Sequence, residues 1–217
     1  MLSILAFLTF PFDRKGRLIH WYARAWGWVI VRSAGVRVVL SGADRIEKGK
    51  PQIFMANHQG AFDIFALLAY LPVDFKWLAK EELFRVPILG WAMKAAGYIS
   101  IDRKGRKKAL ESIERAVATV RQGASVMVFP EGTRSPDGRI HSFKKGGFTL
   151  ALKAGVPIVP ISIRGSRDVL PKSSLRVKPG TIEIVVGRRI GGDGGSLADR
   201  NRMMEEVRKA IENGFAR

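Results

Sequence analysis

The sequence predicts an α/β protein: one domain with a mostly parallel mixed sheet flanked by helices, preceded by an N-terminal membrane-associating helical segment. After Gly35, short apolar strands alternate with helices at a spacing typical of a parallel sheet. The chain has 217 residues, which is enough to bury one full core. The first 34 residues differ from the rest because they are apolar and rich in tryptophan. We therefore divide the chain into a membrane-associating segment, 1–34, and an α/β domain, 35–217.

The N-terminal segment has the composition of an interfacial helix. Residues 1–12 are apolar but too short to span a bilayer, which needs about 20 apolar residues. Residues 18–31 contain three tryptophans around Arg24, and tryptophan rings favour the headgroup region of a membrane. A signal peptide fits poorly, because the basic cluster follows the first apolar run. A pair of ordinary core helices is the alternative, and we favour membrane association.

The elements of the domain follow from periodicity and from their end signals. Strands are expected at 36–40, 52–57, 75–79, 98–101, 125–130, 157–163 and 181–187. Helices are expected at 61–71, 86–97, 106–122, 144–155 and 196–214. Pro72 ends the first helix, Pro87 lies in the first turn of the second, and Gly123 ends the third. Polar clusters follow several of these strands, at the edge where sheets of this kind collect their sites.

The charge of the chain indicates a polyanionic partner. Lys and Arg number 37 against 19 Asp and Glu, a formal net charge of +18. Such a surplus suits nucleic acid, anionic lipid or a phosphorylated substrate. The absence of cysteine excludes disulfides and thiolate metal sites. No metal site is expected from the three histidines either, because none has a second histidine one helical turn away.

His58 and Asp63, in FMANHQGAFDIF (54–65), are the candidate catalytic pair. In one continuous helix their side chains would lie about 140° apart and could not meet. They can pair if His58 lies on the strand-to-helix turn, which Gly60 allows, and Asp63 lies in the first helical turn. A carboxylate on one imidazole nitrogen fixes the tautomer and leaves the other nitrogen as a base. On these residues alone, a buried histidine held for stability explains the pair equally well.

Two other strand ends carry groups that suit an anionic ligand. FPEGTRS (129–135) offers close backbone approach at Gly132, a guanidinium fork at Arg134 and a hydroxyl at Thr133. Glu131 either orients Arg134 or binds a substrate hydroxyl, and a plain turn with a Glu–Arg pair is the alternative. Arg103 follows the strand at 98–101, and a basic helix start comes after it. Cations at a helix N-terminus oppose the helix dipole, so local stability does not explain them.

Four blocks of sequence together resemble the glycerolipid acyltransferase family, best known from 1-acyl-sn-glycerol-3-phosphate (lysophosphatidic acid) acyltransferases. NHQGAFD has the family's N-H-x4-D pattern, and GYISIDR, FPEGTRS and VPIVPI follow in the family's order. The likeness covers roughly residues 36–190. Two positions depart from it, because the family often has serine where Gly60 stands and a larger apolar residue at Ser100. Both departures leave the identity of the acceptor open.

The resemblance implies an enzyme that moves a fatty acyl group from a thioester to the sn-2 hydroxyl of 1-acyl-sn-glycerol 3-phosphate, giving phosphatidic acid. It implies that His58 is the general base and that Asp63 orients it. It implies a phosphate and glycerol site made by Glu131, Gly132, Thr133, Arg134, Arg103 and Lys80. No bound cofactor is expected, and acyl-CoA or acyl carrier protein supplies the thioester. A covalent acyl-enzyme is not needed, and the turn near Gly60 is a candidate source of oxyanion donors.

The expected partners are anionic membrane lipids and lysophosphatidic acid, at the cytoplasmic face of the cell membrane. A basic face gains about 1 kcal/mol per Lys or Arg close to such a surface. Nucleic acid is not expected, because the strand ends lack the stacking aromatic residues of nucleic-acid sites. Two alternatives stay open: the same chemistry on another lyso-lipid, such as lyso-ornithine lipid or lysophosphatidylglycerol, and a basic lipid- or nucleic-acid-binding protein without catalysis.

Overall fold

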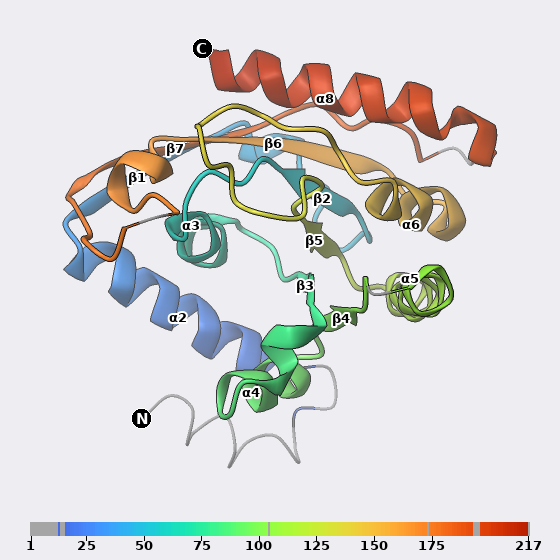
Figure 1. Ribbon diagram of the computed structural model, residues 1–217, viewed down its shortest axis with the longest axis horizontal. Helices are drawn as coiled ribbons and strands as arrows, with labels where there is room; N and C mark the ends of the chain where they lie inside the picture. The colour runs from blue at the N-terminus through green and yellow to red at the C-terminus, as the bar shows by residue number, and fades with distance from the viewer. Residues whose placement is uncertain (1–12, 14–15, 104, 173, 193–195, 217) are drawn as a thin grey trace.

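The structure, a computed structural model, describes residues 13, 16–103, 105–172, 174–192 and 196–216. In this part of the chain seven strands form one sheet in the order β1-β7-β6-β2-β5-β3-β4, with helices on both faces (Figure 1). The strands are β1 (Val36–Ser41), β2 (Ile53–Ala56), β3 (Lys76–Lys80), β4 (Ile99–Ile101), β5 (Val126–Val128), β6 (Ile158–Arg164) and β7 (Gly180–Val186). The predicted α/β fold with a mostly parallel mixed sheet is therefore confirmed.

The register of the sheet brings several strand ends to one edge. Every neighbouring pair of the seven strands is parallel except β6 and β7. In the middle of the sheet, Ile53 of β2 pairs with Val126 of β5 and with Ile158 of β6. All four residues of β2 are buried, as expected for a parallel strand covered on both faces. The loops that follow β2, β5, β6 and β3 consequently lie along the same edge.

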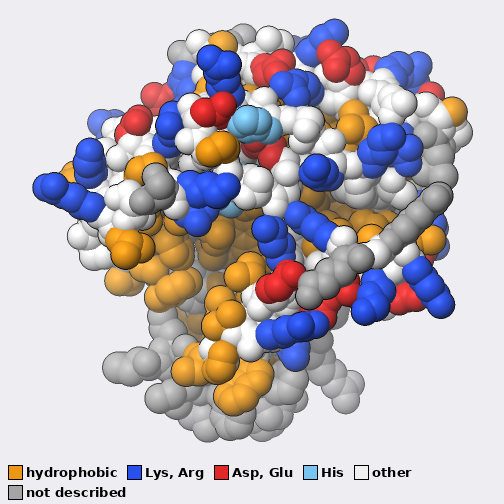
Figure 2. All heavy atoms as spheres, in the orientation of Figure 1, with side chains coloured by type: hydrophobic (Ala, Val, Ile, Leu, Met, Phe, Trp, Pro, Cys, Tyr) orange, Lys and Arg blue, Asp and Glu red, His pale blue; other side chains and the backbone are white. Residues whose placement is uncertain are grey.

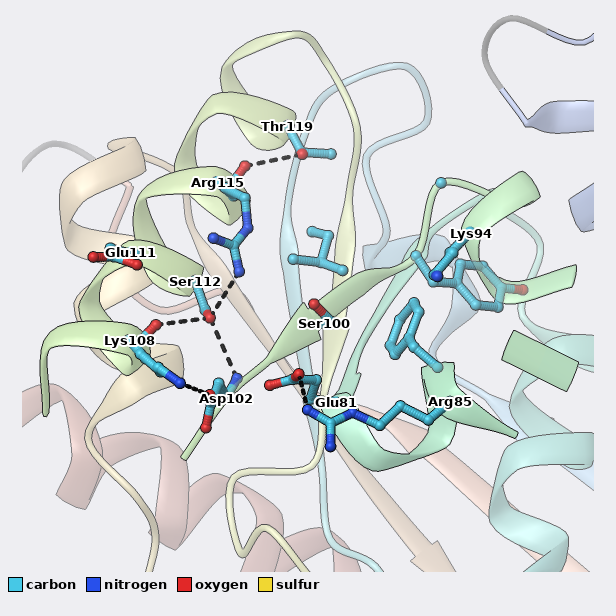
Figure 3. A pocket seen from close by; sticks show the side chains of 14 residues that line it. Glu81, Arg85, Lys94, Ser100, Asp102, Lys108, Glu111, Ser112, Arg115 and Thr119 are labelled. Carbon is cyan, nitrogen blue, oxygen red and sulfur yellow. Dashed lines mark hydrogen bonds and ion pairs between the residues drawn. The ribbon is translucent and has the colours of Figure 1, made fainter. Parts of the chain in front are cut away.

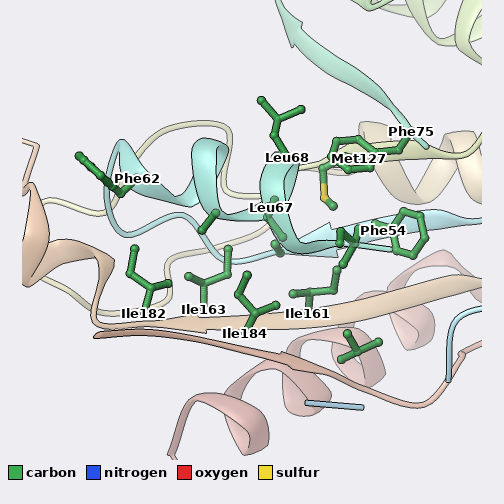
Figure 4. Close-up of a cluster of buried hydrophobic side chains, with 14 of the residues drawn as sticks. Phe54, Phe62, Leu67, Leu68, Phe75, Met127, Ile161, Ile163, Ile182 and Ile184 are labelled. Atoms are coloured by element: carbon green, nitrogen blue, oxygen red, sulfur yellow. The ribbon is translucent and has the colours of Figure 1, made fainter. Parts of the chain in front are cut away.

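Two hydrophobic cores form, one on each face of the sheet. The helices are α2 (Arg17–Ser33), α3 (Phe62–Tyr70), α4 (Leu89–Ala95), α5 (Arg106–Arg121), α6 (Gly146–Ala154), α7 (Ser166–Val169) and α8 (Arg200–Ala216), with 3-10 turns η2 (Ala43–Arg45), η3 (Glu81–Arg85) and η4 (Leu197–Asp199). On one face, Leu67 of α3 packs over Ile161 and Ile163 of β6 (Figure 4). On the other face, side chains of α5, α6 and α8 cover the alternate residues Ile53 and Met55 of β2.

Residues 1–12, 14 and 15 of the N-terminal segment lie outside the described residues. Most of the described part of this segment is the helix α2. It packs on α3, and Gly27 permits the close approach, because a Cβ there would lie 3.0 Å from the carbonyl oxygen of Phe65. Three of its tryptophans, Trp21, Trp26 and Trp28, are exposed by 59%, 44% and 51%. None of the helices in the described ranges combines the length and apolar character that crossing a membrane requires.

The prediction of a helix over 86–97 is wrong for the first part of that range. The 3-10 turn η3 ends at Arg85, and α4 begins only at Leu89. Ile88 has φ +66° and ψ −57°, which interrupts the helical backbone between Pro87 and Leu89. The last helix also begins later than expected, at Arg200, because η4 intervenes after Ser196.

Candidate functional site

The candidate site lies at the carboxyl end of β2, in the middle of the sheet. Asn57, the residue after β2, is fully buried and bridges to β6. Its side-chain Nδ2 donates to the carbonyl oxygen of Ile163 at 2.8 Å, and its Oδ1 accepts the Ile163 N–H at 2.7 Å. These two bonds replace the ladder bonds that end with β2. They fix the point at which the chain leaves the sheet and presents His58.

His58 and Asp63 form the expected contact across the strand-to-helix turn. Nδ1 of His58 lies 2.7 Å from Oδ2 of Asp63. The same oxygen accepts the N–H groups of Gln59 at 2.7 Å and Gly60 at 3.0 Å. The Asp63 side chain is fully buried, whereas that of His58 is 12% exposed. Because an ionised carboxylate only accepts, Nδ1 carries the hydrogen and Nε2 is the nitrogen that can take a proton.

Gly60 is required by close packing against the segment that follows β6. A Cβ at this position would lie 2.5 Å from the carbonyl oxygen of Ser166 and 3.0 Å from that of Leu170. Any side chain here would collide with backbone atoms, which cannot move as the end of a flexible side chain can. The glycine thus allows α7 to pack directly on the turn between His58 and Asp63.

Two aromatic rings hold the imidazole plane of His58. The ring of Phe129 stacks on it with centroids 3.9 Å apart and planes 7° apart. Trp77 of β3 stacks in turn on Phe129, at 5.3 Å and 26°. Stacked rings exclude water from one face of the imidazole and restrict its rotation. Sequence reasoning missed both residues, since each reads as an ordinary apolar position in a buried strand.

Glu131 joins two loops of the site through their backbones. Its Oε1 accepts the N–H of His58 at 2.8 Å, and its Oε2 accepts the N–H of His141 at 2.9 Å. A third bond ties the same loops, because the N–H of Ser135 donates to the carbonyl oxygen of His58 at 2.7 Å. Burial raises the pKa of the Glu131 carboxyl above its ordinary value, although both backbone bonds oppose this shift. In this geometry Glu131 positions His58, instead of pairing with Arg134.

Arg103 lies against the turn that contains Gly132. Its Nη1 donates to the Gly132 carbonyl oxygen at 2.9 Å. Gly132 has φ +78°, and a Cβ there would lie 2.6 Å from the same nitrogen, so the guanidinium occupies the space that a side chain would fill. Burial lowers the pKa of Arg103 below its ordinary value, yet a guanidinium stays charged throughout the physiological range.

The other predicted phosphate-site residues line the same edge. Arg134 is half-buried, and Thr133 is exposed. Nζ of Lys172, from the segment after β6, lies 3.5 Å from the Thr133 hydroxyl and is a further cation that sequence reasoning missed. Lys80 is exposed at the end of β3, which β5 separates from β2, and its backbone pairs with Ile101. Hydrogen bonds therefore link His58 with Asp63 and Glu131, and separately Arg103 with Gly132, whereas Lys80 lies at the periphery.

A cavity of about 690 Å³ over the edge strand β4 is a separate feature (Figure 3). Its charged groups mainly satisfy one another: Lys108 lies 3.6 Å from Asp102, and Arg85 donates to Glu81 at 2.6 Å. The buried Ser112 hydroxyl accepts from Arg115 at 3.0 Å. The cavity contains neither His58 nor Asp63. It is therefore separate from the candidate site.

Comparisons with known proteins agree with one another. The family model described as acyltransferase matches residues 37–164. The chloroplastic 1-acyl-sn-glycerol-3-phosphate acyltransferase BAT2 of Brassica napus is 33% identical over 202 residues, covering 90% of this chain and 58% of its own. A 1-acyl-sn-glycerol-3-phosphate acyltransferase of Pseudomonas aeruginosa is 32% identical over 201 residues, covering 90% and 77%. The chain therefore spans little more than half the length of these plant relatives: 58% of BAT2 and 51% of the 1-acyl-sn-glycerol-3-phosphate acyltransferase LPAT1 of Arabidopsis thaliana.

One solved structure extends the match to the fold of nearly the whole chain. The crystal structure of the 1-acyl-sn-glycerophosphate (LPA) acyltransferase PlsC from Thermotoga maritima aligns with a TM-score of 0.77 and 28% sequence identity. The alignment covers 99% of this chain and 97% of that one.

Proposed function

Because the chain belongs to the acyltransferase family, we propose that it moves a fatty acyl group from a thioester to the sn-2 hydroxyl of 1-acyl-sn-glycerol 3-phosphate. The product is phosphatidic acid, and the reaction is a step of phospholipid biosynthesis. One observation carries the proposal: His58 contacts Asp63 at 2.7 Å on the same carboxyl edge of the sheet that carries Arg103 and Arg134, which suits a general base near an anion site. The relatives, which are named as 1-acyl-sn-glycerol-3-phosphate acyltransferases, support this acceptor.

In the proposed mechanism His58 is the general base. Its Nε2 takes the proton of the sn-2 hydroxyl while that oxygen attacks the thioester carbonyl. The new C–O bond forms, the C–S bond breaks, and His58 returns the proton to the thiolate that leaves. The buried Asp63 carboxylate stabilises the imidazolium in between and keeps Nδ1 protonated. Phe129 holds the ring in the plane that this transfer needs.

The cations along the edge bind the acceptor phosphate in this proposal. Arg134 and Arg103 supply guanidinium groups, which match phosphate geometry through paired donors. Gly132 and Thr133 complete the turn, and Glu131 holds it against His58. Lys80, exposed at the end of β3, serves as an outer cation. Either acyl-CoA or acyl carrier protein is the donor, and no bound cofactor takes part.

The location follows from the acceptor, which is a membrane lipid. We propose that residues 1–34 form the membrane-associating segment and that residues 35–217 form the acyltransferase domain. The exposed tryptophans of α2 suit the interface of a bilayer, and the net charge of +18 suits anionic lipids of the cytoplasmic leaflet.

The test is acyl transfer from labelled palmitoyl-CoA and from palmitoyl-acyl carrier protein to a panel of lyso-lipids. We expect transfer to lysophosphatidic acid, with a loss of about 10²–10⁴-fold in His58→Ala. His141→Ala is the matched control, because His141 also pairs with an aspartate, Asp137, at 2.8 Å but lies exposed. Transfer only to another lyso-lipid would contradict lysophosphatidic acid as the acceptor but would agree with acyl transfer as the reaction. No transfer from either donor would refute the proposal.

A further inference from the structure

A run of exposed apolar side chains lies between β3 and β4. Within nine residues, from 83 to 91, five large apolar side chains are exposed by 40–67%: Leu83, Val86, Ile88, Leu89 and Trp91. Soluble surfaces carry such residues singly, and a cluster of them marks an interaction surface. We call these residues the 83–91 segment.

The backbone of this segment holds its apolar tip in a strained conformation. Ile88 is the one non-glycine residue with positive φ among the residues that the structure describes. A β-branched side chain is strongly disfavoured there, and Ile88 is 59% exposed, so packing within the chain does not compensate the strain. Gly90 closes the turn against Phe84, whose carbonyl oxygen would lie 2.2 Å from a Cβ. Strain that presents an apolar side chain to the outside indicates a binding role.

The helix that continues the 83–91 segment, α4, packs at its end against the start of α2, where Ile19 contacts Ala96. The ammonium group of Lys76 donates to the carbonyl oxygen of Ala96, after α4, at 2.6 Å and to that of Gly16, before α2, at 3.3 Å. Figure 1 shows α4 beside the first turns of α2. In Figure 2, hydrophobic side chains gather in the lower left of the same face, over the region of α2, α3 and α4. The two exposed apolar surfaces therefore adjoin.

Position and charge indicate which partner covers the segment. It follows β3, so it begins at the sheet edge that carries His58. Exposed Lys80 and Lys94 flank it; across 80–94 three cations, with Arg85, face two acids, Glu81 and Glu82, and Arg85 pairs with Glu81 at 2.6 Å. Apolar side chains bordered by lysines match a bilayer interface, where the rings and aliphatic chains enter the acyl boundary and the ammonium groups contact anionic headgroups.

We infer that the 83–91 segment inserts into the interface of an anionic bilayer as a second contact element, distinct from α2. Two contacts orient the chain as one cannot, and they turn the edge that carries His58 toward the lipid surface. A lyso-lipid then reaches the site without crossing water. The inference rests on the proposed lipid acceptor.

The chain has no cysteine, so a single introduced thiol can report on the insertion. Full-length Trp91→Cys, labelled with the environment-sensitive dye NBD, is mixed with phosphatidylcholine vesicles with and without phosphatidylglycerol. We expect NBD emission to rise and shift to the blue on the anionic vesicles, and lipids with a quencher on the acyl chain to suppress it. Leu110→Cys, 49% exposed on α5, is the matched control and should not change. If NBD emission changes equally at positions 91 and 110, the inference is overturned. A blue shift of the probe at 91 that occurs without vesicles and grows with protein concentration would overturn it as well.

A second measurement separates this inference from the proposed function. Leu89→Ser/Trp91→Ser should lower binding to anionic vesicles by about tenfold relative to Leu110→Ser, with an unchanged unfolding temperature. Transfer to a short-chain acceptor dissolved as monomers should stay unchanged in both variants. If the wild type transfers no acyl group but the probe at 91 inserts, the proposed function fails alone. If transfer occurs and the probe stays in water, the inference fails alone.

Discussion

Glu131→Gln tests whether the carboxylate holds the loop that begins at His58 through its two backbone bonds. The wild-type side chain accepts one N–H with each oxygen, from His58 at 2.8 Å and from His141 at 2.9 Å. Glutamine offers one acceptor, so its amide nitrogen must face the other N–H. A buried donor left without an acceptor costs about 1–3 kcal/mol. In a chain of this size each kcal/mol lowers Tm by about 2–4 °C, so we expect a decrease of about 2–12 °C.

The assay is thermal unfolding followed by circular dichroism, with acyl transfer measured on the same preparations. Transfer should slow as well, because the Glu131 side chain anchors the backbone of His58. Glu205→Gln is the control: Glu205 lies on the outside of α8, where its side chain is 60% exposed and pairs with Lys209 at 3.6 Å. Its Tm should match that of the wild type. If Glu131→Gln unfolds at the same temperature as this control, the two bonds do not hold the loop.

Three further outcomes are expected. Burial raises the pKa of the Glu131 carboxyl above its ordinary 4.5, so the folded chain binds the carboxyl proton more tightly than the unfolded chain does. The contribution of this group to the free energy of unfolding therefore falls as the pH rises through the raised pKa. The difference in unfolding free energy between wild type and Glu131→Gln should therefore narrow with rising pH in urea titrations, and a widening would contradict the sign. Asp63→Asn keeps the volume but removes the charge and the tautomer control, and we expect kcat to fall by about 10²–10⁴-fold with little change in KM; an unchanged kcat would exclude Asp63 from the mechanism. Gly60→Ala places a methyl group 2.5 Å from the Ser166 carbonyl oxygen, which should destabilise the fold by about 1–3 kcal/mol or more, whereas Gly105→Ala, with open space around it, should not.

Local patterns predicted the architecture well, because they depend on near neighbours in the chain. Each expected strand is present within a few residues of its predicted range, since apolar runs bounded by glycine and proline are local features. The interruption of the helix expected over 86–97 escaped this reasoning. Periodicity continues across Ile88, and only the packing of Gly90 on Phe84 reveals the turn.

The sequence by itself determined the α/β sheet, the edge at which the polar clusters meet, and the spacing that allows His58 to contact Asp63. All of these follow from short-range periodicity and from a turn of five residues. Only the tertiary structure decided that Glu131 binds the backbone of His58, 73 positions away, and that Phe129 stacks on its ring. Contacts between distant segments depend on how the strands are ordered in the sheet, and that order is a property of the packed core.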